Sequence, residues 1–326
     1  DCDPNVQREL SEFFTFYVPG YKFMPAFRNR MWDGKIRLFS QKTKEIYFGL
    51  FPYIKAFAEE REYHIVCGKD VEVKNKVDKD IVEKFSNSLG QKFEARDYQV
   101  DAIYHSLKYN RALLLSPTAS GKSFIIYALI RYYTHLIKDE TNNRILLIVP
   151  TTSLVEQMYS DFKSYGWNVE KNCHRLYSGY SNQTDKKVLI STWQSLYKLP
   201  KEYFDQFGVV FGDEAHLFKS KSLTEIMSKL IDCKYRIGLT GTLDGAQTHK
   251  LVLEGLFGAV NKVTSTRKLM DKQQLSNLVV RCLILKHTDE NSKIVSNGKY
   301  QDEIDYLVSS RPRQNFIRNL ALKLKG

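Results

Sequence analysis

Five short apolar runs divide the middle of the chain, and each is followed by a stretch with helical periodicity. They occupy residues 112–115, 144–149, 187–191, 208–212 and 235–239. Apolar runs without polar alternation are typical of strands buried on both faces, as in a parallel sheet covered by helices. The pattern therefore predicts an α/β fold, a doubly wound parallel sheet, over residues 91–260. Such a sheet binds ligands at the carboxyl ends of its strands.

The flanking regions have different patterns. Residues 1–90 predict a small α+β domain, and a polar linker over 69–80 leads to a short amphipathic helix that ends at Leu89-Gly90. Residues 261–326 predict a connection and the start of a further domain, with a strand at 279–285 and a helix at 313–325. In the first domain the pattern predicts helices over 9–16 and 52–63 and strands over 35–40, 45–51 and 64–67.

Charge points to a polyanionic partner. The chain has 49 Lys and Arg against 37 Asp and Glu, a net charge of +12. Residues 22–44 hold seven basic side chains and one acidic one, Asp33, with aromatic residues between them. This mixture suits phosphate contacts and stacking on unpaired bases, so we expect Arg28, Arg30, Lys35 and Arg37 to bind nucleic acid. We expect the rings of Phe23, Phe27 and Phe39 to form the domain's own core.

The sequence indicates neither a membrane-spanning segment nor a metal site built from cysteines. No run of about 18 apolar residues occurs, so we expect a soluble protein without a membrane partner. The five cysteines are scattered without a Cys-x-x-Cys pair, which favours reduced thiols rather than a metal site.

The strongest chemical signal lies between the first apolar run and the next helical stretch. It is the loop Ser116-Pro117-Thr118-Ala119-Ser120-Gly121-Lys122-Ser123. A strand-to-helix loop presents backbone N–H groups to phosphate oxygens, Lys122 can reach the β and γ phosphates, and the Ser123 hydroxyl can bind Mg²⁺. Ser116 stands where the phosphate-loop pattern has its first glycine, so an incidental Gly-Lys-Ser is the alternative. We expect residues 118–123 to bind ATP.

Two adjacent carboxylates, Asp213 and Glu214, follow the apolar run at 208–212. At the end of a strand, one acidic residue can hold Mg²⁺ while its neighbour polarises the attacking water. We therefore expect Asp213 to bind the metal and Glu214 to act as general base. A helix N-cap is the alternative for such a pair.

Four further polar segments flank the apolar runs. Arg96-Asp97-Tyr98-Gln99 precedes the phosphate loop, and the Gln99 amide can pair with an adenine edge. The segments containing Thr151 and Thr192-Trp193-Gln194 follow strands and suit contacts to a nucleic-acid backbone. Thr240-Gly241-Thr242 follows the last apolar run and can link the two sites. Each could be a helix cap, but their joint order predicts an ATP-driven motor.

The series RDYQ, SPTASGKS, VPTTSL, STWQSL, GDEAHL and GLTGTL resembles the first-domain motifs of superfamily-two helicases of the DEAH-box type, over residues 94–243. The run 27–34, FRNRMWDG, is similar to the small leading domain of UvsW-like helicases. The resemblance implies a RecA-like motor domain with ATP and Mg²⁺ as cofactors. It further implies an ATP-dependent DNA helicase or translocase that acts in recombination and in the processing of replication forks and R-loops. The location implied is the cytosol of a bacterial or phage-infected cell.

Individual roles follow from the same resemblance. It implies adenine recognition by Gln99, phosphate binding by Lys122, Mg²⁺ binding by Ser123 and Asp213, water activation by Glu214, and coupling by His216 and residues 240–242. The DNA would be branched or single-stranded, or an RNA–DNA hybrid. Two alternatives stay open: the motor part of a restriction or nuclease complex, and a non-catalytic nucleic-acid-binding module with a decayed phosphate loop.

The family's second RecA-like domain carries an arginine finger, and no Gln-x-x-Gly-Arg-x-x-Arg segment occurs here. Such an arginine contributes about 10³–10⁵ in rate where it has been studied. We therefore expect this chain to bind ATP and hydrolyse it weakly or not at all, with the second domain supplied by a longer form of the same chain.

Overall fold

The computed structural model describes residues 2–68, 71, 75–217, 220–243, 247–276, 281–296 and 298–324. Their contacts form two compact units, Asp1–Leu275 and Ser276–Gly326. The described part of the second unit contains the helices α13 (Asp289–Ser296), α14 (Tyr300–Ser309) and α15 (Arg311–Lys323). Residues 281–285 form no strand, contrary to expectation, and the rest of that predicted strand lies outside the described residues.

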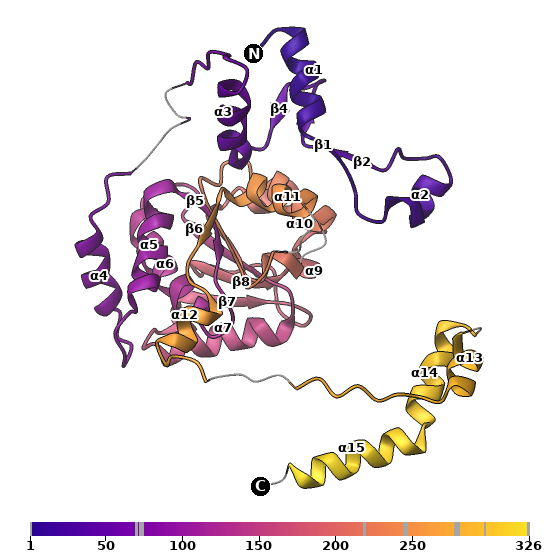
Figure 1. The fold of residues 1–326 in the computed structure, drawn as a ribbon. Helices are drawn as coiled ribbons and strands as arrows, with labels where there is room; N and C mark the ends of the chain where they lie inside the picture. The colour runs from indigo at the N-terminus through magenta and orange to yellow at the C-terminus, as the bar shows by residue number, and fades with distance from the viewer. Residues whose placement is uncertain are drawn as a thin grey trace. The chain divides into compact units, whose positions relative to one another are not determined.

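A seven-stranded parallel sheet forms the centre of the first unit (Figure 1). The strand order is β11-β5-β10-β9-β6-β8-β7, and all its ladders are parallel. Two strands were not predicted, because the segments CHRL and VNK lack an apolar run. The strands are β5 (Arg111–Leu115), β6 (Arg144–Val149), β7 (Cys173–Leu176), β8 (Val188–Thr192), β9 (Phe207–Gly212), β10 (Tyr235–Thr240) and β11 (Val260–Lys262).

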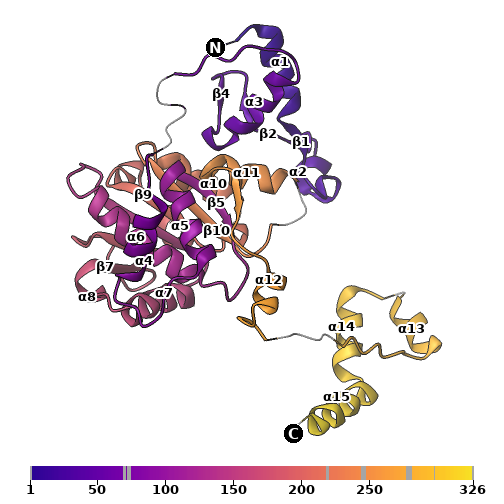
Figure 2. The ribbon, with the colours of Figure 1, turned by 60° about the vertical axis from the view of Figure 1, so that its left-hand side comes forward.

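Alternate residues of the strands enter two separate cores, one on each face of the sheet. On β5, for example, Ala112 and Leu114 pack in one core and Leu113 in the other. The first core is completed by α4 (Lys79–Asn87), α5 (Asp97–Tyr109), α6 (Lys122–Leu136) and α7 (Thr152–Ser164). The second is completed by α9 (Trp193–Leu196), α10 (Ser220–Lys229) and α11 (Gln247–Phe257), as Figure 2 shows for the longer helices. The predicted doubly wound α/β fold is confirmed.

The N-terminal segment is a small α+β arrangement with two antiparallel pairs, β1 with β2 and β3 with β4. The helix predicted at 9–16 begins and ends earlier, and the strand predicted at 45–51 stops at Ile46 because Pro52 favours the first turn of a helix. The strand predicted at 64–67 is absent, since these residues are mostly exposed. The elements are α1 (Pro4–Phe13), β1 (Thr15–Tyr17), η1 (Tyr21–Phe23), α2 (Pro25–Arg28), β2 (Lys35–Arg37), β3 (Phe39–Ser40), β4 (Glu45–Ile46), η2 (Phe48–Leu50) and α3 (Phe51–Glu59).

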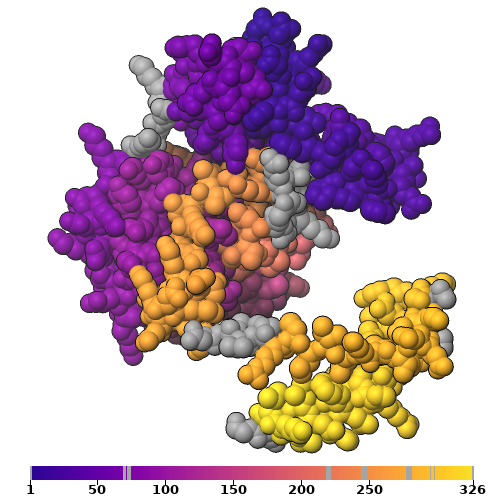
Figure 3. Space-filling model, in the orientation of Figure 1, coloured from indigo at the N-terminus to yellow at the C-terminus, as the bar shows by residue number. Residues whose placement is uncertain are grey.

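This segment packs on α11 through η2, and Figure 3 shows indigo and purple N-terminal residues against orange ones. The Tyr53 hydroxyl donates to Glu254 Oε2 at 2.7 Å. A Cβ on Gly49 would overlap the Glu254 carbonyl, so glycine permits this close approach of two backbones. The small segment and the sheet therefore share one core, which includes Leu50 and Phe57.

Elements at both predicted domain boundaries contact the sheet domain. Helix α4 packs on α5 and contributes Val82 to the first core. At the other end, β11 pairs with β5 and begins at Val260, where we expected the motor domain to end. The remaining elements are α8 (Val169–Asn172), η3 (Lys201–Phe204), η4 (Ala215–Leu217) and α12 (Thr266–Asp271). Within the described ranges, no helix is long and apolar enough to cross a bilayer.

Candidate nucleotide and nucleic-acid site

The loop between β5 and α6 is closed at its base by hydroxyl groups. The Ser116 and Ser120 oxygens lie 2.6 Å apart, and Ser120 donates to the Pro117 carbonyl at 2.6 Å. Ser116 is buried, and its backbone is not in the left-handed region, which explains why glycine is dispensable there. Ala119 and Gly121 do have positive φ, +64° and +80°. The loop is thus a formed turn whose exposed tip is Thr118 and Ala119.

Gln99 is buried against this loop. Its Oε1 accepts from the Arg96 backbone N–H at 2.9 Å, and its Nε2 donates to the Ser120 carbonyl at 2.9 Å. One Nε2 hydrogen and one Oε1 lone pair are left for a ligand. Gln99 therefore braces the phosphate loop, and its pairing with adenine stays a prediction.

Gly121→Ala is expected to lower ATP affinity about tenfold. The new methyl would meet the Gln99 Nε2 and would require a left-handed alanine, which costs about 1–2 kcal/mol. Titration calorimetry with a non-hydrolysable ATP analogue measures the effect. Gly179→Ala is the matched control, because Gly179 also has positive φ but has no atom within 4 Å of the new methyl. Equal losses of ATP affinity in both variants would contradict the bracing role.

Lys122 and Glu214 form an ion pair at the carboxyl end of the sheet. Strand β10 lies between β5 and β9, so the two side chains reach across it. Glu214 has φ +48°, an uncommon backbone conformation for a residue other than glycine and one that recurs at functional sites. The structure therefore brings the predicted phosphate-binding lysine and general base into direct contact.

A chain of contacts leads from this ion pair to the segment after β10. His216 Nδ1 lies 3.4 Å from Glu214 Oε2 and 2.7 Å from Thr240 Oγ1. Because Thr240 gives its one hydroxyl proton to the Thr242 carbonyl at 2.6 Å, Nδ1 of His216 must carry a proton to complete the contact. Gly241 adjoins the loop: a Cβ there would lie 3.6 Å from Lys122 Nζ. His216 and residues 240–242 thus connect to both the loop and Glu214.

Asp213 is 2 % exposed, and its Oδ1 has no hydrogen-bond partner. Burial raises the pKa of this carboxyl to about 6, against the opposing charge of Lys122. A buried carboxylate oxygen without a partner suits a hard cation such as Mg²⁺. The Ser123 hydroxyl lies 3.1 Å from the Tyr165 hydroxyl. Asp213 therefore fits the predicted metal, whereas Ser123 would have to exchange this partner for it.

The predicted backbone contacts after β6 and β8 differ in accessibility. Thr151 is exposed and caps α7, accepting from the Leu154 N–H at 3.3 Å. Gln194 is exposed at the start of α9. Thr192 is buried, and its hydroxyl lies 3.0 Å from that of Ser195. Accessibility therefore favours Thr151 and Gln194 for contact with a strand and disfavours Thr192.

The predicted basic cluster in the N-terminal segment lies partly around a hollow of about 620 Å³. Its lining includes Arg28, Arg30 and Trp32. Arg37 is instead paired with Asp33, so part of its charge is neutralised. Lys35 lies over the Tyr17 ring, with Nζ 4.9 Å from the centroid.

The aromatic side chains of this segment divide between surface and core. The expectation that Phe23 belongs to the core is wrong, because its side chain is 85 % exposed in a short turn away from either core. Phe27 is half-buried and packs against Tyr21, whereas Phe39 is buried, as expected. Phe23 adds an exposed ring to the basic cluster.

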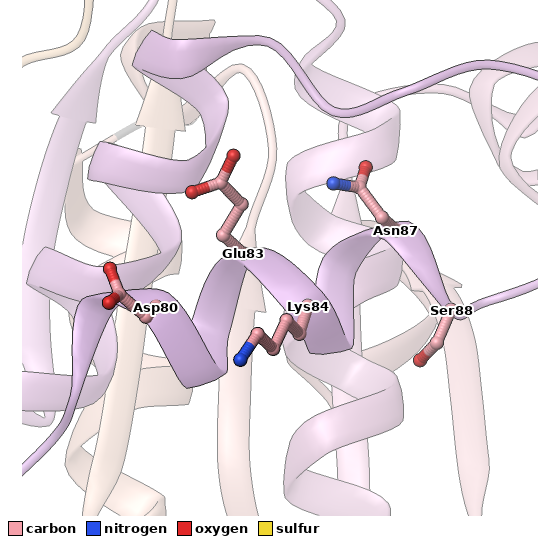
Figure 4. Close-up of a pocket in the computed structure, with 5 residues that line it drawn as sticks. All are labelled: Asp80, Glu83, Lys84, Asn87 and Ser88. Atoms are coloured by element: carbon pink, nitrogen blue, oxygen red, sulfur yellow. The ribbon is translucent and has the colours of Figure 1, made fainter.

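Figure 4 shows a separate hollow on α4, lined by Asp80, Glu83, Lys84, Asn87 and Ser88. All five come from one short stretch of helix and its cap, and their charges are mixed. The hollow includes no residue of the phosphate loop or of the Asp213–Glu214 pair. We assign it no role.

The sequence did not reveal two residues that contact the site. Tyr165, at the end of α7, contacts Ser123, and Lys272 forms a 2.8 Å ion pair with Asp97 beside Gln99. Neither belongs to a recognisable motif, so no signal in the sequence could have identified them.

Comparisons with known proteins agree with this geometry. A family model described as the type III restriction enzyme res subunit matches residues 92–245, and one described as the N-terminal part of DNA helicase UvsW matches residues 1–68. A solved structure of the UvsW helicase from bacteriophage T4 is 34 % identical, with a TM-score of 0.73, and the match covers 80 % of this chain and 94 % of that one. The chain belongs to the UvsW family of superfamily-two helicases.

UvsW relatives extend beyond the matched region. The ATP-dependent DNA helicase uvsW of Enterobacteria phage T4 is 33 % identical over 99 % of this chain and 65 % of its own length. A second T4 UvsW structure has a TM-score of 0.74 and 32 % identity, over 99 % of this chain and 65 % of that one. The chain thus spans about two thirds of the length of the curated UvsW relative, and its central sheet is the family's RecA-like fold.

Proposed function

We propose that the chain is the ATP-binding part of a DNA helicase or translocase that acts on branched DNA. The observation that supports this most is the ion pair between Lys122 of the phosphate loop and Glu214 of the acidic pair. Two groups with complementary tasks in phosphoryl transfer, one from each motif, meet at the ligand-binding edge of a doubly wound sheet.

The ion pair also indicates how binding and hydrolysis are linked. Without nucleotide, the Lys122 ammonium neutralises Glu214, so neither group is free for its task. A triphosphate would take Lys122 and leave the Glu214 carboxylate available to accept a proton from water. Mg²⁺ held by Asp213 would neutralise charge on the phosphates.

Contacts to Glu214 can couple the nucleotide site to the residues proposed to bind DNA. Loss of the Lys122 partner changes the charge beside His216, which is bonded to Thr240. Exposed Thr151 and Gln194 lie after neighbouring strands β6 and β8 at the same edge of the sheet. We propose that these residues form the DNA track and that His216 with residues 240–242 couples it to the nucleotide.

The N-terminal cluster is the proposed grip on a branch point. Arg28→Glu with Arg30→Glu is expected to weaken binding of a three-way DNA junction and to lower the slope of log affinity against log salt by about 2, roughly one for each lost phosphate contact. Fluorescence anisotropy over a salt series measures both. Arg37 is kept, because Asp33 already neutralises it.

The control carries the same charge change elsewhere. Lys84→Glu with Lys138→Glu alters two exposed lysines of the sheet domain. The N-terminal cluster does not bind the junction if the salt slope is unchanged in the arginine variant. The same holds if the lysine variant loses as much affinity for the junction as the arginine variant does.

A motor for a restriction complex is the second candidate, favoured by the match of residues 92–245 to the restriction-enzyme family. The UvsW N-terminal match at residues 1–68 and the identity over nearly the whole chain favour the helicase. Weak hydrolysis by this chain alone stays a prediction.

A further inference from the structure

A further cavity lies at the amino ends of the strands, opposite the phosphate loop. Its volume is about 480 Å³. It is lined by η2 and α3 on one side, and on the other by the end of α5 and by residues that precede β10 and β11 or begin β5. The phosphate loop follows the carboxyl end of β5, whereas Arg111 is the first residue of that strand. The length of β5 therefore separates the two sites.

Arg111 is the unusual group in this cavity. It is half-buried at the start of an apolar strand, yet it has neither a hydrogen-bond acceptor nor a carboxylate partner among the described residues. Its guanidinium lies over the Phe48 ring, whose centroid is 5.0 Å from the guanidinium carbon. Burial, together with the nearby Arg236 charge, lowers the pKa of Arg111 to about 10. A half-buried guanidinium without a polar partner is costly, and it calls for a partner that the described residues do not supply.

Arg236, on the adjacent strand, provides an internal comparison. It is also half-buried, but it donates to the backbone carbonyls of Cys233 and Leu230. Its charge is therefore solvated by the protein. Arg111, at the paired position of β5, has no equivalent acceptors in the described part of the chain.

The rest of the lining combines positive charge with open aromatic surface. Lys234 adds a further cation, and none of the described lining residues is acidic. The side chains of Phe48 and Tyr109 are 46 % and 38 % exposed. The charges of Arg111 and Lys234 favour an anion, and flat exposed rings favour a stacked planar group.

We propose that this cavity binds a nucleotide, with its phosphate on Arg111 and Lys234 and its base against Phe48 and Tyr109. An inorganic anion would leave the exposed parts of the two rings uncovered, and an apolar ligand would leave the Arg111 guanidinium without an anionic partner. The nucleotide is either free or one unit of a nucleic-acid strand, and the chemistry is the same for both. The site is separate from the proposed ATP site and does not depend on it.

The test uses the full chain carrying Lys122→Ala, so that the phosphate loop contributes no binding. Calorimetry without Mg²⁺ would compare 2′-deoxyadenosine 5′-monophosphate with 2′-deoxyadenosine and with inorganic phosphate. We expect one monophosphate to bind per chain. We expect the nucleoside alone and inorganic phosphate alone each to bind at least about tenfold more weakly. A 5′-phosphorylated dinucleotide that binds more tightly than the monophosphate assigns the site to a strand, and equal affinity assigns it to a free nucleotide.

Two variants test the residues. Arg111→Met is expected to weaken monophosphate binding at least about tenfold while leaving the melting temperature unchanged or higher, because it removes a half-buried charge without a polar partner. Lys234→Gln, at an exposed position, is expected to weaken binding without affecting folding, and Lys163→Gln, also exposed, is the control. The proposal is overturned if the monophosphate does not bind, if inorganic phosphate binds equally well, or if Lys234→Gln leaves binding unchanged.

Discussion

Replacing Glu214 with glutamine is expected to raise the ATP affinity of this chain and, in a longer form that includes the predicted second domain, to lower ATP turnover about 10²–10⁴-fold. Turnover falls because glutamine cannot accept the proton from the attacking water. Affinity rises because Glu214 competes with the phosphates for Lys122, and the neutral amide removes that competitor. Single-turnover hydrolysis and calorimetry with a non-hydrolysable analogue measure the two effects separately.

Glu170 provides the control for this substitution. It pairs with Lys163 through an exposed ion pair on the same domain, at 2.8 Å. Glu170→Gln should leave both quantities unchanged, since exposed pairs contribute little. A Glu214→Gln variant that retains its turnover would show that another group activates the water.

Replacing Lys122 with alanine is expected to weaken ATP binding about 100-fold. The variant loses a charged hydrogen-bond donor to the phosphates, which contributes about 1.5–3 kcal/mol. It also leaves the Glu214 carboxylate without its partner and facing the triphosphate, which adds repulsion. Calorimetry with the same analogue measures the loss.

Lys163→Ala is the matched control, because it removes a paired lysine at the surface. Its ATP affinity should equal that of the parent chain. Unchanged affinity in Lys122→Ala would show that the loop between β5 and α6 does not bind the phosphates.

The sequence predicted the central strands well because burial on both faces requires continuous apolar side chains, as in LLL of β5 and VVF of β9. It missed β7 and β11 because strands at the sheet edges, with polar residues such as His174 and Asn261, bury less of their surface. The N-terminal segment was harder, since its strands are two or three residues long and periodicity cannot be read over so few positions.

Within the site, the chemistry of each motif followed from its residue types, but the contacts between motifs did not. The Lys122–Glu214 pair depends on how the side chains reach across β10, which no local pattern records. The engagement of Ser123 with Tyr165, the bracing role of Gln99 and the unpaired Arg111 likewise arise from tertiary packing.

The central claim is that Lys122 and Glu214 act on the same triphosphate, and a double-mutant cycle on ATP affinity tests it most directly. The cycle compares the parent chain, Lys122→Ala, Glu214→Gln and the double variant, with Lys122 and Glu170 as the reference pair. We predict that the effects at Lys122 and Glu214 are non-additive by more than about 0.5 kcal/mol, whereas those of the reference pair add. Additive effects at Lys122 and Glu214 would contradict the claim.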